Sequence, residues 1–154
     1  MIADSGERRE FETGAVRDMA EGKGRCDLMP LDVVAAVMGD IVIRAISNFQ
    51  IYGTRENLIY AMNQFIYENY DDNTYEAMLE VSKHFEEGAK KYGEYNWQKG
   101  LPEYCYIDSA VRHYLKYKMG ETSERHDRAF MWNIMCLLWT NKHITGEEKE
   151  KENE

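Results

Sequence analysis

The sequence predicts an all-α fold, a bundle of about four to five helices, and three observations lead to this prediction. Apolar residues recur at intervals of three and four through most of residues 30–143. Clusters of Gly, Asp, Asn and Pro separate these periodic segments. One short piece, "DIVIRAI" at residues 40–46, could also be a strand, and we expect no sheet of more than two short strands.

The first part of the chain divides at Pro30. Residues 1–29 are rich in Gly, Arg, Asp and Glu without an apolar period, which predicts an irregular leader. Pro30 suits the first turn of a helix, and apolar residues follow it at helical spacing from Val33 to Ala45. Gly39 weakens this helix, and residues 40–46 could instead form a strand.

Two helices should follow, separated by a polar turn. Thr54 is a suitable N-cap for the second helix, which carries Leu58 and Phe65 on its apolar face. The cluster "DDNT" at residues 71–74 ends that helix and caps a third one. Residues 93–102 form a loop because of their glycines and proline.

Two further helices complete the bundle. Gly120 should end the fourth, and Thr122 or Ser123 should cap a fifth that runs through "RAFMWNIMCLLWT". The charge run "GEEKEKENE" closes an acidic tail, residues 144–154, which we expect to be disordered. The domain organisation is therefore a leader (1–29), an all-α domain (30–143) and a tail (144–154).

Composition limits the class of protein. The chain has 154 residues, 44% hydrophobic and 31% charged, as in a soluble one-domain protein. No apolar run approaches the roughly 20 residues that span a bilayer, and the polar N-terminus is not a signal peptide, so we expect no membrane partner. Cys26, Cys105 and Cys136 do not have the spacing of a zinc site, which favours reduced thiols in a cytoplasm.

The charge limits the ligand. A formal net charge of −9 argues against a nucleic-acid polymer, because proteins that bind one need a basic face. A nucleotide is still compatible, because divalent cations can stand between carboxylates and phosphates.

Carboxylates occur on several predicted helices. Glu76, Glu80 and Glu87 share one face of the third helix, although from that helix alone a solvated face with charge pairs is the simpler explanation. Asp108 and Arg112 lie one turn apart on the fourth helix, where they could form no more than an exposed ion pair.

The fifth helix offers Glu124, His126 and Asp127 at its start, where acids also favour the helix dipole. His113 alone is more often a structural histidine than a ligand. Asn133 lies in an apolar segment and needs hydrogen-bond partners, which indicates either a core network or a ligand.

Together, these candidate residues are stronger evidence for a functional site than any one of them is alone. Several helices that each offer carboxylates are a recognised way to build a multi-metal site. The loop after the third helix adds residue types that suit phosphate charge, base hydrogen bonding and base stacking: Lys90, Lys91, Lys99, Asn96 and Trp97.

Three blocks of the sequence resemble a known family. "GAKKYGEYNWQKGLP", "YIDSAVRHYLKYKMGE" and "ERHDRAFMWN" are similar to the signature blocks of phage and prophage dATP/dGTP diphosphohydrolase-like (MazZ-like) proteins, which are related to the all-α MazG-type nucleotide pyrophosphohydrolases. The leader "TGAVRDMAEGKGRCDLMPLDVVA" also resembles that of many members. The resemblance covers roughly residues 8–143.

The resemblance implies a fold, a reaction and a location. MazG-type proteins are helical bundles that assemble as homodimers or homotetramers, and Mg²⁺ or Mn²⁺ held by Glu and Asp binds the triphosphate. A metal-activated water attacks the α-phosphorus and yields a monophosphate and pyrophosphate. For this chain it implies a purine deoxynucleotide ligand, dATP or dGTP, and a place in the cytoplasm of a phage's bacterial host.

The metal-binding motif of MazG-type proteins matches this sequence only in part. MazG-type proteins pair Glu-x-x-Glu on one helix with Glu-x-x-Asp on a later one. Residues 124–127, "ERHD", match the second element, whereas the third helix has Glu80, His84, Glu86 and Glu87 in place of an intact first element. The resemblance implies Glu80, Glu87, Asp108 and Asp127 as catalytic metal ligands, Glu124 as a further ligand, and Glu86 in place of Glu87 if the helix is rotated.

Nucleotide-binding residues are assigned by chemistry. Lys90, Lys91, Arg112 and Lys116 are candidates for phosphate, with His113 and His126 in the same neighbourhood. Tyr92, Asn96, Trp97 and Asn133 are candidates for the sugar or base. The leader segment "GKGR", residues 22–25, could fold over the phosphates, although it is not a P-loop.

Two other functions fit the same residues. A non-catalytic protein could use the same pocket to sequester or sense a nucleotide. A helical interaction module would leave the carboxylates simply solvated.

Overall fold

The computed structural model describes residues 8–18 and 21–146, and the all-α prediction is confirmed there. The only sheet among these residues has two strands. The helices are α1 (Leu31–Met38), α2 (Ile41–Tyr52), α3 (Arg55–Asn69), α4 (Thr74–Tyr92), α5 (Glu103–Lys118) and α6 (His126–Thr140). The shorter elements are β1 (Arg8–Glu10), β2 (Val16–Asp18), the 3₁₀ turns η1 (Cys26–Leu28) and η2 (Asn96–Lys99), and a π-helical turn, η3 (Asn141–Thr145).

The segment that sequence left open between helix and strand forms two helices. Gly39 adopts a left-handed conformation (φ 62°) and ends α1, because its amide donates to the carbonyl of Ala35. Asp40 then caps α2 by accepting a hydrogen bond from the amide of Ile43 at 2.9 Å. One glycine followed by one capping acid thus divides the expected first helix in two.

The start of α6 differs from the prediction. Neither Thr122 nor Ser123 caps it, since α6 begins at His126 with Arg125 at its N-cap. The amide of Ser123 instead donates to a carboxylate oxygen of Glu121 at 2.6 Å. Residues 120–125 therefore form a short loop between α5 and α6.

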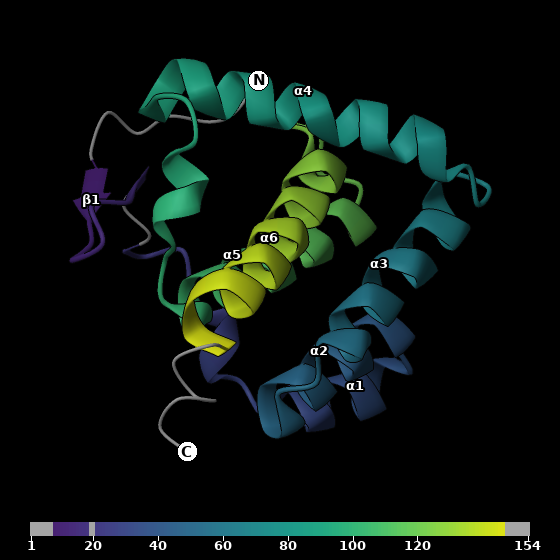
Figure 1. Cartoon of the computed structure of the whole chain (residues 1–154). Helices are drawn as coiled ribbons and strands as arrows, with labels where there is room; N and C mark the ends of the chain where they lie inside the picture. The colour runs from purple at the N-terminus through teal and green to yellow at the C-terminus, as the bar shows by residue number, and fades with distance from the viewer. Residues whose placement is uncertain (1–7, 19–20, 147–154) are drawn as a thin grey trace.

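The helices are arranged around α5 and α6, which pack on each other at the centre of the molecule (Figure 1). Helix α4 crosses one end of this pair, α3 runs from the end of α4 towards α2, and α1 and α2 lie beside the other end. The core is aromatic where α3, α5 and α6 meet: the ring of Phe65 lies 4.6 Å from that of Phe130 and 6.2 Å from that of Tyr114. These ring contacts join α3 to both central helices.

The leader is not irregular throughout. Strands β1 and β2 pair antiparallel with Arg8 opposite Asp18. Arg17 then enters the bundle, donating hydrogen bonds to Ser109 Oγ and Asn133 Oδ1, both at 3.0 Å. Its guanidinium also lies 5.1 Å from the centre of the Trp132 ring. Tertiary contacts to α5 and α6, which a local pattern cannot reveal, therefore hold this short hairpin.

The remaining expectations concern the tail, the thiols and the membrane. Residues 144 and 145 belong to the π-helical turn, and residues 147–154 lie outside the described part of the chain. Cys26, Cys105 and Cys136 are free thiols. None of the described helices is both long enough and apolar enough to cross a bilayer.

Candidate functional site

Two carboxylates from different helices meet at the start of α6. Glu80 of α4 accepts hydrogen bonds through Oε2 from Nε (2.9 Å) and Nη2 (2.5 Å) of Arg128. Asp127 accepts from Nε (3.0 Å) and Nη2 (2.9 Å) of Arg125, and from the hydroxyl of Tyr70 at 2.6 Å. The same Nη2 of Arg125 lies 3.3 Å from Glu80 Oε2. We call these five residues the carboxylate–arginine cluster; one cationic nitrogen lies between its two acids.

Both acids of the carboxylate–arginine cluster are ionised at neutral pH. Hydrogen bonds from Lys83 and Arg128 lower the pKa of Glu80 to about 2. Burial opposes the ionisation of Asp127, but hydrogen bonds outweigh it, the strongest from Arg125, and lower the pKa of that carboxyl to about 2. The cluster therefore offers ionised oxygen donors, the ligands that Mg²⁺ and Mn²⁺ prefer.

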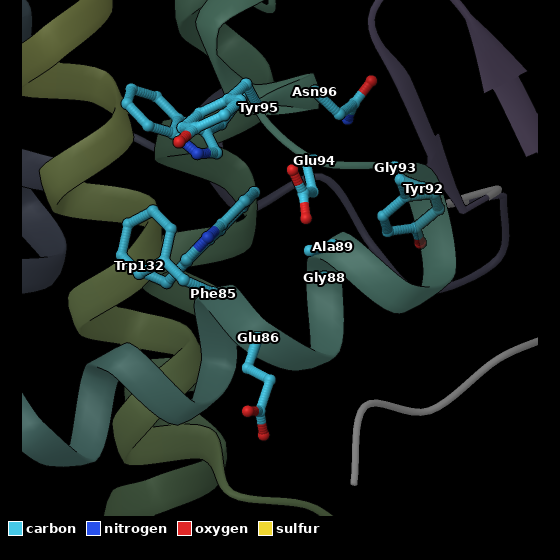
Figure 2. Close-up of a pocket in the computed structure, with 11 residues that line it drawn as sticks. Phe85, Glu86, Gly88, Ala89, Tyr92, Gly93, Glu94, Tyr95, Asn96 and Trp132 are labelled. Carbon is cyan, nitrogen blue, oxygen red and sulfur yellow. The ribbon is translucent and has the colours of Figure 1, made fainter.

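An aromatic hollow of about 340 Å³ opens beside the C-terminal half of α4 (Figure 2). The ring of Trp97 meets that of Phe85 edge-on, with 5.8 Å between their centroids, and Trp132 lies 6.1 Å from Phe85. Flat aromatic walls of this kind suit a stacked nucleobase. The lining residues are Phe85, Glu86, Gly88, Ala89, Tyr92, Gly93, Glu94, Tyr95, Asn96, Trp97 and Trp132.

The carboxylate–arginine cluster and the aromatic hollow are successive along the contact between α4 and α6. His84 follows Glu80 by one turn of α4, and Trp132 follows Arg128 by one turn of α6, a step of about 6 Å along a helix axis. The rings of His84 and Trp132 lie 5.5 Å apart. Burial lowers the pKa of His84 to about 4, so this imidazole is neutral at pH 7. A ligand could thus place an aromatic part in the hollow and an anionic part beside the arginines.

A second polar group lies where α5 faces the loop before α6. Nδ1 of His113 lies 2.9 Å from Nδ1 of His126, and Oε1 of Glu124 lies 3.3 Å and 3.5 Å from these two nitrogens. Burial and the neighbouring His126 lower the pKa of His113 well below its usual value. Within residues 8–18 and 21–146, this is the single group of three His, Cys, Asp or Glu side chains whose ligand atoms converge.

A third polar group joins the leader to α5. Asp108 is buried and forms a two-pronged ion pair with Arg112, with distances of 2.9 Å and 3.0 Å. The amide of Cys26 donates to Asp108 at 2.8 Å, and Arg112 donates to the carbonyl of Gly24 at 3.0 Å. The simpler alternative for this pair, an exposed ion pair, is therefore wrong: the pair is buried and binds the backbone of residues 24–26.

The predicted metal ligands do not form one group of ligand atoms among the described residues. Glu80 and Asp127 come together through Arg125. Glu124 joins the two histidines, and Asp108 faces the leader. Glu86 is exposed, 3.9 Å from Lys90, and Glu87 is half-buried further along α4.

The residues predicted to contact the nucleotide also lie in different places. Tyr92, Asn96 and Trp97 line the aromatic hollow. The amide of Asn96, however, pairs with the backbone of Val16, accepting from its nitrogen at 3.0 Å and donating to its oxygen at 2.9 Å. Asn133 is bound to Arg17, which is the core network that its burial required.

The cationic candidates lie at different depths. Lys90 is exposed, and the ammonium of Lys91 lies 5.2 Å from the centre of the Tyr92 ring. Lys116 is half-buried on α5, and Arg112 is occupied by Asp108. His113 and His126 face each other rather than the hollow.

Four residues that contact these groups in the structure were not predicted from the sequence. Arg125 and Arg128 flank Asp127 in "ERHDR", and this pattern of alternating charge could have indicated a carboxylate–arginine network. Trp132 and Arg17 gave no such signal, because a tryptophan in an apolar helix is most simply a core residue and the leader has no period.

Comparison with known proteins gives one match. The family model described as dATP/dGTP diphosphohydrolase, N-terminal, matches residues 65–152, more than half of the chain. The match includes α4, α5 and α6, and therefore the carboxylate–arginine cluster, the group of His113, Glu124 and His126, and the Asp108–Arg112 pair. No curated protein and no solved structure matches the chain significantly.

Proposed function

Because the chain belongs to the dATP/dGTP diphosphohydrolase, N-terminal, family, we propose that it hydrolyses dATP or dGTP to the monophosphate and pyrophosphate with Mg²⁺ or Mn²⁺. The family name implies a diphosphohydrolase, and the matched residues include the carboxylate–arginine cluster and the aromatic hollow. The substrate, the metal and the site are the proposal.

The observation that best supports this site is the shared position of Arg125. Its Nη2 lies within hydrogen-bonding distance of Glu80 on α4 and of Asp127 on α6. Two ionised carboxylates that reach one cationic nitrogen are close enough to share a divalent cation after a small shift. The donor set is all oxygen, so it fits Mg²⁺ or Mn²⁺. Bound there, such an ion would neutralise phosphate charge and lower the pKa of a bound water.

The arginines of the cluster would then serve the phosphates. Arg125 and Arg128 both use Nε and Nη2 against carboxylates, the fork geometry that also fits phosphate oxygens. A triphosphate that entered with its metal would compete for these guanidinium groups and release Glu80 and Asp127 as ligands. We propose that the arginines hold the phosphates and that the acids hold the metal.

The aromatic hollow would receive the base. Along α4 it begins at Phe85, about one and a half turns from Glu80, and its walls include Trp97, Trp132 and the exposed ring of Tyr95. Stacking on such rings tolerates any base, so preference for a purine requires further polar contacts at the rim. Residues 93–96 line the hollow, and we propose that backbone groups of this loop supply them.

A nucleotide panel tests the proposed reaction. Each of the four deoxynucleoside triphosphates and the matching ribonucleotides is incubated with the protein and Mg²⁺ or Mn²⁺, and the products are separated. We expect monophosphate and pyrophosphate in equal amounts, fastest with dATP or dGTP, and none in the presence of a chelator. Release of single phosphate groups instead would contradict the proposed cleavage position.

Nucleotide binding without turnover is the second candidate function. It is favoured by one observation: both acids of the cluster are neutralised by arginines, so a metal must displace strong ion pairs. Nucleotide that raises the melting temperature but remains intact after long incubation with either metal would support this alternative.

A further inference from the structure

His113, Glu124 and His126 form a compact triangle of ligand atoms. The separations are 2.9 Å between the two Nδ1 atoms, 3.3 Å from His113 Nδ1 to Glu124 Oε1, and 3.5 Å from His126 Nδ1 to Glu124 Oε1. Ligand atoms bound tetrahedrally to Zn²⁺ at its usual bond lengths lie about 3.3 Å from one another. The triangle therefore has the dimensions of one face of such a coordination shell before any rearrangement.

We propose that His113, Glu124 and His126 bind one first-row transition metal ion of the Zn²⁺ class. This site does not depend on the proposed hydrolysis, and it is separate from the carboxylate–arginine cluster. Two imidazoles and one carboxylate are a common ligand set of zinc sites that keep a position for water. Nitrogen donors also select against Mg²⁺, which prefers oxygen.

A second contact orients the buried histidine. Nε2 of His126 contacts the carboxylate of Glu121, and the amide of Ser123 donates to the other oxygen of that carboxylate at 2.6 Å. Histidines that ligate metals typically donate their second N–H to a carboxylate in this way, which leaves the first nitrogen free to bind the ion. In the tautomer with the proton on Nε2, the lone pair of Nδ1 points into the triangle.

The triangle is reachable from solvent on one side. The side chain of His126 is 1% exposed, while those of His113 and Glu124 are 20% and 14% exposed. His126 forms the floor, and the other two ligands form the rim. An ion could therefore enter, and a water molecule could complete its coordination.

Metal titration tests the proposed site. The full chain, stripped of metal with a chelator, is titrated with Co²⁺, followed by visible absorption, and with Zn²⁺, followed by calorimetry, without any nucleotide. We expect one ion per chain, Co²⁺ ligand-field bands, displacement of Co²⁺ by Zn²⁺, and no displacement by Mg²⁺. Wild-type protein that binds neither ion stoichiometrically would show that the triangle is only a hydrogen-bonded group.

Single substitutions test which side chains bind the ion. Glu121→Gln, which alters only the orienting contact, should weaken Zn²⁺ binding about 10–100-fold, and His113→Gln and Glu124→Gln at least as much. His143→Gln, which changes an exposed histidine outside the triangle, should bind like wild type. Circular dichroism checks that each variant is folded. Unchanged affinity in folded His113→Gln and Glu124→Gln would overturn the assignment.

A measurement on the wild-type chain tests the assignment even if a variant does not fold. Histidine ¹⁵N resonances of the wild-type chain, recorded with and without one equivalent of Zn²⁺, should change at Nδ1 of His113 and His126 and remain unchanged at His84 and His143. Changes at other histidines alone would overturn the proposal as well.

Discussion

Asp127 carries its charge at a buried position because Arg125 and Tyr70 bind it. Its pKa in the fold, about 2, lies below the value of about 3.9 expected for the unfolded chain. The stabilisation from this charge is therefore complete above about pH 4 and is lost as the pH falls towards 2. Its size is on the order of 2 kcal/mol.

Asp127→Asn should accordingly flatten the acid side of the stability curve. The free energy of unfolding in urea, measured from pH 2 to pH 7, should fall less steeply below pH 4 in the variant than in wild type. Equal slopes in the two proteins would mean that Asp127 is not held in its ionised form by these neighbours.

Tyr95 offers the cleanest probe of the aromatic hollow. Its side chain is 61% exposed, and its backbone is left-handed (φ 60°), a conformation that asparagine tolerates well. Tyr95→Asn should therefore remove a ring without disturbing the fold, and it should weaken dATP and dGTP binding by about 1–3 kcal/mol if the base stacks there. Calorimetry gives the affinity, with Tyr67→Asn, equally exposed on α3, as the control. Equal affinities for all three proteins would exclude Tyr95 from the base site.

At the scale of elements, sequence predicted the helices whose ends are encoded locally. The "DDNT" cluster does end α3 and cap α4, because Asp71 and Asp72 have positive φ and the side chain of Asn73 accepts from the amide of Glu76. Gly120 also lies just past α5, as expected. The start of α6 was missed because Ser123 uses its amide with Glu121 rather than its hydroxyl with the helix.

The functional groups were predicted less completely than the helices, for a physical reason. Helical spacing predicts which face of its own helix a side chain occupies, but not which residue of another helix it meets. Glu80 and Asp127 were paired through the resemblance, whereas Asp108 is occupied by the leader and Glu124 by two histidines. These contacts depend on packing angles and on a loop that no local pattern encodes.

The buried ion pair of α5 makes the leader part of the domain. Asp108→Asn would leave Arg112 buried beside a neutral partner, and breaking such a pair costs about 3–5 kcal/mol. We expect a lower free energy of unfolding and faster hydrogen exchange at residues 24–28. Asp32→Asn, at an exposed position on α1, is the control. If Asp108→Asn instead leaves the leader protected but removes stabilisation by Mn²⁺, Asp108 acts as a metal ligand, as the resemblance implies.

At the scale of the whole molecule, α1 to α3 expose several large apolar side chains, and contiguous exposed apolar residues often mark interaction sites. Val37 is 81% exposed and Ile51 is 57% exposed, and further apolar side chains are exposed nearby in the chain: Val33, Met38, Ile41, Tyr52, Ile59 and Tyr60. We expect the chain to assemble through these side chains of α1 to α3 as a homodimer or homotetramer.

Sedimentation equilibrium measures the assembly. Wild type should sediment as a dimer or tetramer at micromolar concentration, and Val37→Asp should shift it towards monomer. Leu28→Asp places the same charge at a 70% exposed leucine of the leader and should have no effect. A monodisperse wild-type monomer would contradict the expectation.

Turnover by variants of the carboxylate–arginine cluster tests the central claim most directly. Wild type, Glu80→Gln, Asp127→Asn and the control Glu56→Gln, at an exposed position on α3, are compared with dGTP and dATP in Mg²⁺, and pyrophosphate release is followed. If Glu80 and Asp127 hold the catalytic metal, kcat should fall about 100-fold or more in their two variants and stay near wild type in Glu56→Gln. Wild-type rates in folded Glu80→Gln and Asp127→Asn, or no hydrolysis by wild type with either nucleotide, would contradict the proposed site.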